Sequence, residues 1–300
     1  MSVAFFSVAN DRHFLGAAAL LNSLREVGHD EPFYLLDCGL TDAQRAAIAP
    51  HATVLPAPPD TSPFLLKAIG PLEVDPEVAV ILDADVIVRR PLTHLIGEKP
   101  VVFLNDRTER FEQEWIRFGF GRLRRIPYLN SGQMVFPRGS GLLRRLQEGN
   151  ERMLEILRAE PDKCRVPTDP FYYTDQDVLN ALIGSLDEGE YVVSDEVAYW
   201  PFDAPYEHAS LLHHIMDKPW LASLRSSVYS TEMVRLLAAG PVVPPPGDVP
   251  VRLRPGLGGA VARARASVRH TVRERTRGRL GLRRRFATVA DPPWLRPSGN

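Results

Sequence analysis

Residues 78–88 read VAVILDADVIV, and this stretch indicates the fold class most directly. The unbroken apolar run Val78–Leu82 is typical of a strand that is buried on both faces of a parallel sheet. It leads straight into Asp83-Ala84-Asp85, so two carboxylates stand at the end of the strand. The simplest interpretation is a strand that ends in two solvated acids. Hard oxygen ligands at such a position also suit Mg²⁺ or Mn²⁺ bound to a diphosphate.

Strand and helix patterns alternate through the first hundred residues and continue beyond them. The expected strands are Val3–Val8, Pro32–Asp37, Val78–Leu82, Val101–Leu104 and Gln133–Phe136. The expected helices are Phe14–Val27, a short helix that runs from the capping box of Thr41 and Gln44 to Ala49, Phe64–Leu72, Gly141–Arg158 and Asp175–Leu186. This alternation predicts an α/β fold with a mostly parallel sheet. Ligands of such folds gather outside the carboxyl ends of the strands, where the two aspartates are expected.

The bulk composition narrows the class of protein. The chain has 300 residues and 44% hydrophobic content, enough for one substantial core, or for one core and an appendage. No run approaches the ~18 apolar residues of a membrane span, and the N-terminus lacks the basic region of a secretory signal. Cys38 and Cys164 lack metal-ligand spacing. We therefore expect a cytoplasmic protein.

Charge is divided unevenly along the chain. Residues 252–300 hold thirteen Arg and two acidic residues, a net charge of +11, which leaves −12 on residues 1–251. The Pro-rich segment 241–256 is expected to link a domain of residues 1–240 to a basic tail of residues 257–300.

The tail has a helical pattern of its own. One arginine stripe recurs every four residues at Arg265, Arg269, Arg273 and Arg277. A partly helical tail of this kind could contact anionic lipid headgroups at the inner face of the membrane, and a disordered solvated tail is the alternative. Nucleic acid is not expected as a partner, because the tail lacks interleaved aromatic residues.

Short polar signatures follow one another in a definite order. They are Val8–Gly16 (VANDRHFLG), Lys67, Asp83-Ala84-Asp85, Leu129–Gly132 (LNSG), Asp175–Asn180 (DQDVLN) and Leu211–Trp220 (LLHHIMDKPW). Taken singly, Asn130-Ser131-Gly132 is typical of a turn and Asp175 of a helix cap. As an ordered series over residues 1–225, the signatures resemble those of glycosyltransferase family 8, which includes glycogenin and bacterial lipopolysaccharide galactosyltransferases.

The resemblance implies a fold, a donor and a metal. The fold is GT-A, a Rossmann-like arrangement with a mostly parallel central sheet. The donor is a UDP-sugar, most often UDP-glucose or UDP-galactose, and the cofactor is Mn²⁺ or Mg²⁺. A hexose would pass with retention of configuration to a saccharide, lipid-linked or small-molecule acceptor.

The resemblance also assigns the metal ligands. Asp83 and Asp85 would hold the ion together with a histidine before Lys218-Pro219-Trp220. The family places this histidine six residues before the lysine, but here that position is Leu212. His213 is the expected ligand if one loop residue is deleted, and His214 is the alternative.

Donor contacts and catalytic roles follow from the same resemblance. The expected donor-binding residues are Val8, Asn10, His13, Lys67, Asp83, Ala84, Asp85, Asn130, Ser131, Gly132, Asp175, Gln176 and Lys218. Lys67, Asp175 and Gln176 are expected to be catalytic, with Gln176 nearest the anomeric carbon. A cation and two lysines can neutralise the charge of a leaving diphosphate without proton transfer. A second carboxylate pair placed as in retaining hydrolases is not evident, which favours displacement on one face of the sugar.

Two other functions fit parts of the sequence. A haloacid-dehalogenase-like phosphatase also has an apolar strand followed by DxD, but that strand normally begins the domain, and here more than seventy residues precede it. A catalytically degenerate protein of the transferase fold would bind a nucleotide sugar without turning it over.

Overall fold

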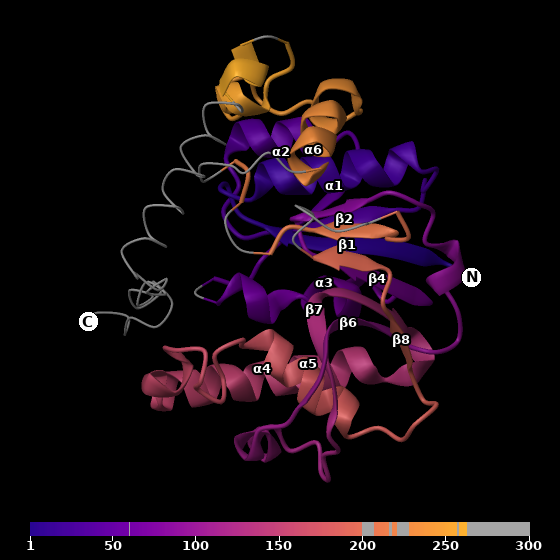
Figure 1. Ribbon diagram of the computed structural model, residues 1–300, viewed down its shortest axis with the longest axis vertical. Coiled ribbons are helices and arrows are strands. Elements are labelled where there is room, and N and C mark those ends of the chain that lie inside the picture. The colour runs from indigo at the N-terminus through magenta and orange to yellow at the C-terminus, as the bar shows by residue number, and fades with distance from the viewer. Residues whose placement is uncertain (60, 200–206, 216–217, 221–227, 257, 263–300) are drawn as a thin grey trace.

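The computed structural model describes residues 1–59, 61–199, 207–215, 218–220, 228–256 and 258–262. A seven-stranded sheet in the order β3-β2-β1-β4-β7-β6-β8 forms its centre (Figure 1). The strands are β1 (Val3–Ala9), β2 (Phe33–Asp37), β3 (Thr53–Pro56), β4 (Val78–Leu82), β6 (Val101–Arg110), β7 (Ile126–Pro137) and β8 (Val192–Ser194). β7 runs antiparallel to β4 and β6, and the other pairings are parallel. The predicted α/β fold with a mostly parallel sheet is confirmed.

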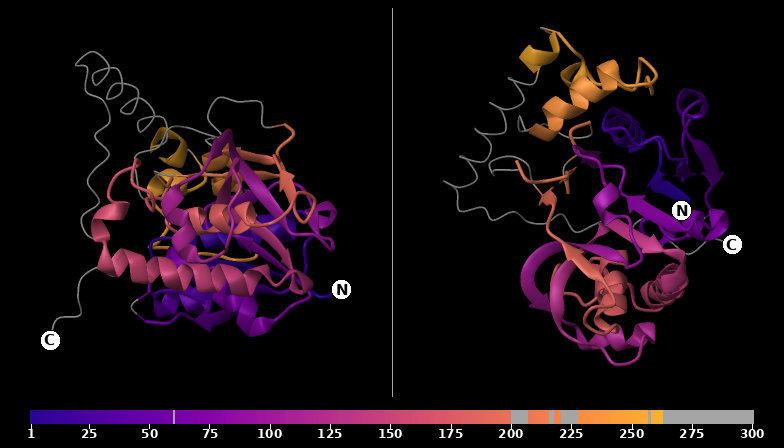
Figure 2. Two further views of the ribbon diagram at one scale, coloured as in Figure 1. Left: turned by 90° about the horizontal axis from the view of Figure 1, so that it is seen from below. Right: turned by 90° about the vertical axis from the view of Figure 1, so that its right-hand side faces the viewer.

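Helices cover both faces of this sheet (Figures 1 and 2). α1 (Phe14–Glu26), α2 (Asp42–Ile48) and α6 (Val228–Ala239) lie on one face. α3 (Ile69–Val74), α4 (Leu142–Ala159) and α5 (Asp175–Gly184) lie on the other. The described residues also form short 3-10 helices: η1 (Pro63–Leu66), η2 (Thr93–Leu95), η3 (Gln113–Phe118), η4 (Arg138–Ser140), η5 (Pro161–Cys164) and η6 (Val251–Leu253).

Two apolar cores follow from the alternation of side chains along the strands. Successive residues of a strand point to opposite faces. Phe5 of β1 therefore packs in the core that includes α1 and α6, and Phe6 packs in the core that includes α4 and α5. All five residues of β4 are buried, as the apolar run predicts for a central strand.

A second, three-stranded sheet brings a distant segment to the end of β4. It has the order β5-β10-β9, with β5 (Val86–Val88), β10 (Leu211–His213) and β9 (Val197–Tyr199). β10 pairs antiparallel with β5, and this register sets His213 opposite Val86. The register thus places His213 next to the Asp83-Ala84-Asp85 segment, because Val86 follows Asp85 directly.

Local predictions and the structure differ in three strands of the central sheet. β6 and β7 are longer than expected, and Asn130-Ser131-Gly132 lies inside β7 instead of forming a turn. The backbone of this polar stretch is paired with β6, for example Asn130 with Phe103, so the strand continues through it. β3, which was not predicted, pairs with β2 at the edge of the sheet. The predicted capping box of Thr41 and Gln44 at the start of α2 is confirmed.

The Pro-rich segment contacts the domain at several points. Gln44 of α2 donates to Asp248 at 2.7 Å, and the Val242 amide donates to Asn22 of α1 at 2.8 Å. Leu253 is buried. The segment expected as a linker therefore lies against α1 and α2 as far as η6.

The arginine stripe of the tail, from Arg265 to Arg277, lies outside the described residues. Among the helices that the structure describes, none has the length and apolar character that crossing a membrane requires.

Candidate active site

Asp83 and Asp85 stand at the carboxyl end of β4 but differ in exposure. The Asp83 amide donates to the Gly132 carbonyl at 2.8 Å, and the Val86 amide donates to the Asp83 carbonyl at 3.0 Å. This tight turn projects both carboxylates from the sheet edge. The Asp83 side chain is 28% exposed, whereas that of Asp85 is 9% exposed.

Lys67 joins Asp83 to Asp175. Its Nζ lies 2.7 Å from Asp83 Oδ1 and 2.9 Å from Asp175 Oδ2, and it donates to the Ser131 carbonyl at 3.0 Å. Burial opposes the charge of Lys67, but the two carboxylates outweigh burial and raise its pKa. Burial raises the pKa of Asp83, and Lys67 opposes that shift. The ammonium group is therefore charged and is fixed between two elements of the site.

Asp85 has two cationic or polar partners from the distant segment. His213 Nε2 lies 3.2 Å from Asp85 Oδ1, and Lys218 Nζ forms an ion pair with Asp85 Oδ2. Lys218 also donates to the His214 carbonyl at 2.7 Å. Burial favours the neutral acid, but Lys218 and His213 outweigh it and lower the pKa of Asp85. Asp85 is thus a carboxylate held by contacts across more than a hundred residues of sequence.

Asp83, Asp85 and His213 form a group that could hold a metal ion. One ligand atom from each lies within 4.8 Å of the others. Gly132 leaves the space between His213 and Asp83 free: a Cβ there would fall 2.5 Å from His213 Cε1 and 2.8 Å from Asp83 Oδ2. Two carboxylates and an imidazole are ligands for a divalent cation of the Mn²⁺ or Mg²⁺ type. The residues present therefore fit a divalent metal.

His214 lies apart from this group. Its ring meets the ring of Tyr229 edge-on, with centroids 5.1 Å apart. Burial, and then the positive charge of Lys218, lower the pKa of His214 to about 4. The structure thus directs His213, and not His214, toward the two aspartates.

The start of α5 presents Asp175 and Gln176 beside Lys67. Thr174, which precedes them, has φ 49° and ψ −110°, a backbone conformation that is strained for a β-branched residue. Gln176 forms a side-chain hydrogen bond with Tyr128. Backbone strain of this kind clusters at functional sites.

Asp177 is a fully buried carboxyl behind this turn. It accepts hydrogen bonds from the Tyr173 amide at 2.9 Å and the Tyr128 hydroxyl at 3.3 Å. Burial raises the pKa of Asp177 to about 8, although Arg110 opposes the shift. The Arg110 guanidinium lies over the rings of Tyr128 and Tyr173, at 5.0 and 5.1 Å from their centroids.

The first loop lies against the Lys218-Pro219-Trp220 segment. Asn10 accepts from the His13 ring at 2.8 Å, and Trp220 Nε1 donates to the Arg12 carbonyl at 2.5 Å. Gly16 is needed here, because a Cβ would collide with the Ala84 carbonyl and the Trp220 ring. Burial, and then Lys218, lower the pKa of His13. Three of the sequence signatures therefore meet at one point.

The structure brings nearly all the predicted site residues to this edge of the sheet. Asn130 joins the group through its Oδ1, which accepts from the Gly132 amide at 2.7 Å. Sequence reasoning missed two contributors, Gln133 and Tyr199, which contact His213 and each other. The available signal was Gln133, a polar residue at the head of an apolar strand.

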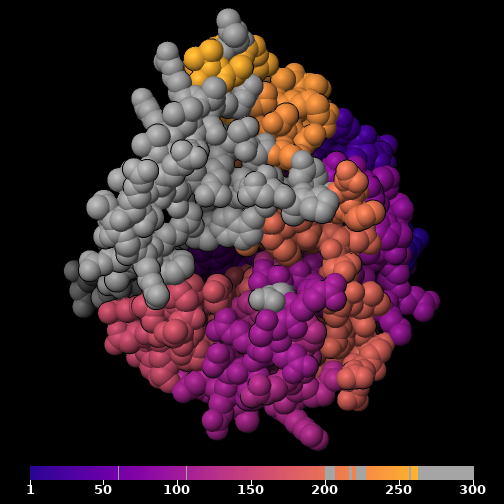
Figure 3. All heavy atoms as spheres, in the orientation of Figure 1, coloured from indigo at the N-terminus to yellow at the C-terminus, as the bar shows by residue number. Residues whose placement is uncertain are grey.

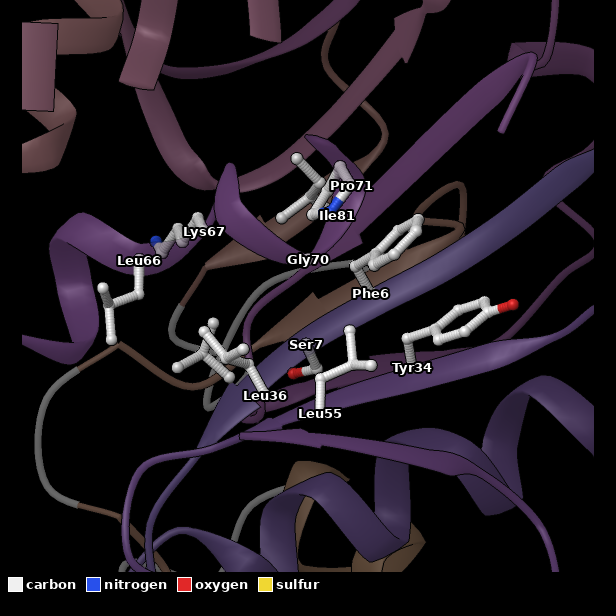
Figure 4. Close-up of a pocket in the computed structure, with 11 residues that line it drawn as sticks. Phe6, Ser7, Tyr34, Leu36, Leu55, Leu66, Lys67, Gly70, Pro71 and Ile81 are labelled. Atoms are coloured by element: carbon white, nitrogen blue, oxygen red, sulfur yellow. The ribbon is translucent and has the colours of Figure 1, made fainter. Parts of the chain in front are cut away.

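A small cavity adjoins the site on the α3 side of the sheet. Lys67 lies at one end, and Phe6 and Tyr34 lie at the other (Figure 4). The lining residues enclose about 230 Å³, part of it open to solvent. The lining is mostly apolar, which does not suit a diphosphate. In Figure 3, the surface above the magenta residues of β6 and β7 is hollowed toward the purple part of the chain.

The fold is that of solved GT-A glycosyltransferase structures. No protein-family model matches the chain, and no curated protein matches it in sequence. Solved structures do match. The galactosyltransferase LgtC in complex with donor and acceptor sugar analogues is 17% identical, with a TM-score of 0.56, over 82% of this chain and all of that one.

Two further structures agree. An active-site mutant of LgtC is 18% identical, with a TM-score of 0.58, over 80% of this chain and 97% of that one. The bifunctional glycosyltransferase WbbM is 13% identical, with a TM-score of 0.54, over 80% of this chain and 50% of that one. At these identities the likeness establishes the fold, and the predicted GT-A fold is confirmed.

Proposed function

We propose that this protein is a metal-dependent, retaining glycosyltransferase of family 8 that transfers a hexose from a UDP-sugar. One observation carries the proposal: Lys67, Asp83, Asp85, His213 and Lys218 gather at the carboxyl end of the central strand. This is where α/β folds bind ligands, and the set combines a metal-binding group with two lysines that can meet a diphosphate.

The metal-binding group is assigned to Asp83, Asp85 and His213. A bound Mn²⁺ or Mg²⁺ would supply Lewis-acid stabilisation of the diphosphate leaving group. Lys218 would turn from Asp85 toward the diphosphate, and Lys67 would hold the donor while it stays paired with Asp175. These charges stabilise the leaving group without a proton transfer.

The remaining polar residues would orient the donor. Val8, Asn10 and His13 would frame the uridine, and Ala84 would contact it through the backbone. Asn130, Ser131, Gly132 and Asp175 would line the sugar. Gln176 would lie nearest the anomeric carbon and would stabilise positive charge there during displacement on one face.

Binding tests the proposal most directly. A thermal-shift panel of nucleotide sugars with Mn²⁺ should identify a UDP-sugar that stabilises the full chain by ~2.7 kcal/mol at a hundred times its Kd. The same donor should release UDP in the presence of Mn²⁺ and not in excess EDTA. Equal stabilisation by all nucleotide sugars, or UDP release in EDTA, would contradict the proposal.

Stereochemistry tests the mechanism. The anomeric proton signal of the first product formed should be that of an α-linkage from an α-linked donor. A β-linked product would exclude a retaining enzyme.

A catalytically degenerate donor-binding protein is the second candidate. Lysines of the chain itself neutralise both aspartates, Lys67 at Asp83 and Lys218 at Asp85, an arrangement that also suits binding without turnover. Such a protein would bind UDP-sugar in the panel and release no UDP. The phosphatase alternative loses its basis, because three parallel strands precede β4 and the matching folds are those of glycosyltransferases.

The chemical class of the acceptor and a role for the basic tail are also part of the proposal. LgtC was solved with an acceptor sugar analogue, and we assign a saccharide or lipid-linked acceptor to this chain by analogy. The basic tail of residues 257–300 would hold the domain at an anionic membrane surface inside the cell. Truncation after residue 256 should abolish sedimentation with anionic liposomes and leave UDP release intact, whereas liposome binding by the truncated protein would refute this role.

A further inference from the structure

Gln133 is a polar residue at a strand position where an apolar one is expected. It follows Gly132 in β7, is 0% exposed, and precedes the apolar run Met134-Val135-Phe136. A buried amide without hydrogen bonds costs free energy, so its partners indicate what it does. Its Nε2 lies 2.6 Å from Nδ1 of His213, and its Oε1 accepts from the Tyr199 hydroxyl at 3.2 Å.

The two ring nitrogens of His213 therefore face different partners. Nε2 faces Asp85 Oδ1 at 3.2 Å, and Nδ1 faces the amide of Gln133. A neutral imidazole carries one proton. When the amide nitrogen of Gln133 donates to Nδ1, the proton resides on Nε2 and points at Asp85. In this tautomer, Nε2 has no lone pair to offer to a cation.

A half-turn of the Gln133 amide reverses the arrangement without losing a hydrogen bond. Oε1 then accepts from Nδ1–H of His213, and Nε2 of the amide donates to the Tyr199 oxygen. This orientation of the amide favours the tautomer of His213 that carries its proton on Nδ1. The Nε2 lone pair then faces Asp85 Oδ1, so a cation held by that carboxylate could also be bound by Nε2.

We propose that Gln133, held by Tyr199, is a positioning residue that orients the imidazole of His213 and matches its tautomer, and so sets how tightly the site holds a divalent cation. The inference rests on the proposed function through its metal site. Partners of this kind commonly fix the tautomer of histidine ligands, and their loss typically lowers metal affinity about 10–100-fold.

The first test reads the tautomer directly in the metal-free full chain. Nitrogen NMR of histidine-labelled protein should show His213 protonated at Nε2, and Mg²⁺ with UDP should move the proton to Nδ1. Gln133→Glu offers only acceptor oxygens, so His213 should carry the proton at Nδ1 even without metal. His213→Asn identifies the signals.

The second test measures the Kd for Mn²⁺ alone by titration calorimetry. Gln133→Met, which keeps the size but no hydrogen bond, should weaken binding about 10–100-fold. Tyr199→Phe should weaken it less, and Gln133→Glu should bind more tightly than Gln133→Met. Met134→Leu is the matched control: it is the next buried residue of β7, packs in the core with α4 and α5, and should leave the Kd unchanged.

The outcomes separate this inference from the proposed function. A metal-free wild type with His213 already protonated at Nδ1, or a Gln133→Met variant with wild-type Mn²⁺ affinity, would overturn it. If the wild type bound neither Mn²⁺ nor UDP, the proposed function would fail. The metal-free spectra would still decide on Gln133: a shift of the proton in Gln133→Glu supports its role, and identical tautomers in wild type and variant refute it.

Discussion

Asp83 and Asp85 stand one residue apart, yet they draw their partners from different regions of the molecule. Asp83 pairs with Lys67, which belongs to the same half of the chain and lies sixteen residues earlier. Asp85 pairs with His213 and Lys218, which arrive on β10 and the segment after it. The first region is assembled by parallel strands that follow one another in sequence, whereas the second depends on the pairing of β10 with β5.

The two regions therefore contribute different properties to the site. One supplies a carboxylate that is already paired with a lysine, and the other supplies further ligands and buries the second carboxylate. The region of β1 to β4 holds Asp83, whose carboxylate is paired with Lys67 of the same region. The region around β10 adds the imidazole and the second lysine, and it makes Asp85 the less exposed carboxylate of the pair. Substitutions in the two regions should therefore fail in different ways.

Removing either carboxylate should have the largest effect. Asp83→Asn and Asp85→Asn should each lower UDP release about 10³-fold, since a preorganised electrostatic contact to the leaving group is lost. Circular dichroism should show both variants folded. The contrast lies in metal affinity: Asp85→Asn removes a contact of both His213 and Lys218 and should weaken Mn²⁺ binding more. Equal Kd values for Mn²⁺ in the two variants would break the comparison.

Lys67→Met should cost mainly stability. It leaves Asp83 and Asp175 without their shared cation, and removing one partner of a buried pair costs about 3–5 kcal/mol. Urea unfolding at pH 7 measures this loss. Lys67→Arg, which keeps the charge, is the control and should lose less. A Lys67→Met variant as stable as wild type would show that hydration of the two carboxylates makes up for the loss of the lysine.

Lys218→Met should change two affinities in opposite directions: that for Mn²⁺ alone and that for UDP in the presence of Mn²⁺. Lys218 pairs with Asp85, so its removal should strengthen binding of Mn²⁺ alone, because the ammonium group no longer competes for that carboxylate. Affinity for UDP with Mn²⁺ should fall, since the diphosphate loses a partner. Titration calorimetry with and without UDP distinguishes the two. A fall in both affinities would mean that Lys218 serves only to hold the site together.

The neighbouring histidines should differ in metal affinity. His213→Ala should weaken Mn²⁺ binding about 10–100-fold, since its Nε2 faces Asp85, whereas His214→Ala should have a smaller effect. Mn²⁺ titrations of both variants compare them. The reverse ranking would assign the ligand to His214 and a shifted register to the segment after β10.

Asp177→Asn should have the smallest effect on activity and a distinct effect on stability. Burial raises the pKa of Asp177 to about 8 from an ordinary 3.8, so the folded protein keeps a proton that the unfolded chain loses above about pH 4. The stability that this group contributes is complete below pH 4 and is lost progressively as the pH rises to about 8, by at most about 1.4 kcal/mol per pH unit.

Asparagine does not ionise, so Asp177→Asn should match wild type at pH 4 and have the higher Tm at pH 8. Thermal unfolding at the two pH values tests this. A wild-type Tm that rises from pH 4 to pH 8, with no such rise in the variant, would assign Asp177 a lowered pKa and contradict the prediction.

The sequence alone determined the first region. The apolar run of β4 and the capping box of α2 are local patterns whose physical causes act within a few residues. The same holds for the position of Asp83 and Asp85, because an unpaired charge is costly in the middle of a buried strand. Lys67 was also foreseen, but its place between Asp83 and Asp175 was not.

The tertiary structure alone decided the second region. The pairing of β10 with β5 joins residues more than a hundred positions apart, and no local pattern specifies such a register. Asn130-Ser131-Gly132 resembles a turn in isolation, and β6 and β4 pair with β7 and keep it extended. Whether His213 or His214 faces the aspartates was open in the sequence, because strand residues alternate between faces and the partner strand sets which face is inward. Backbone hydrogen bonds between distant strands therefore placed the groups that complete the site.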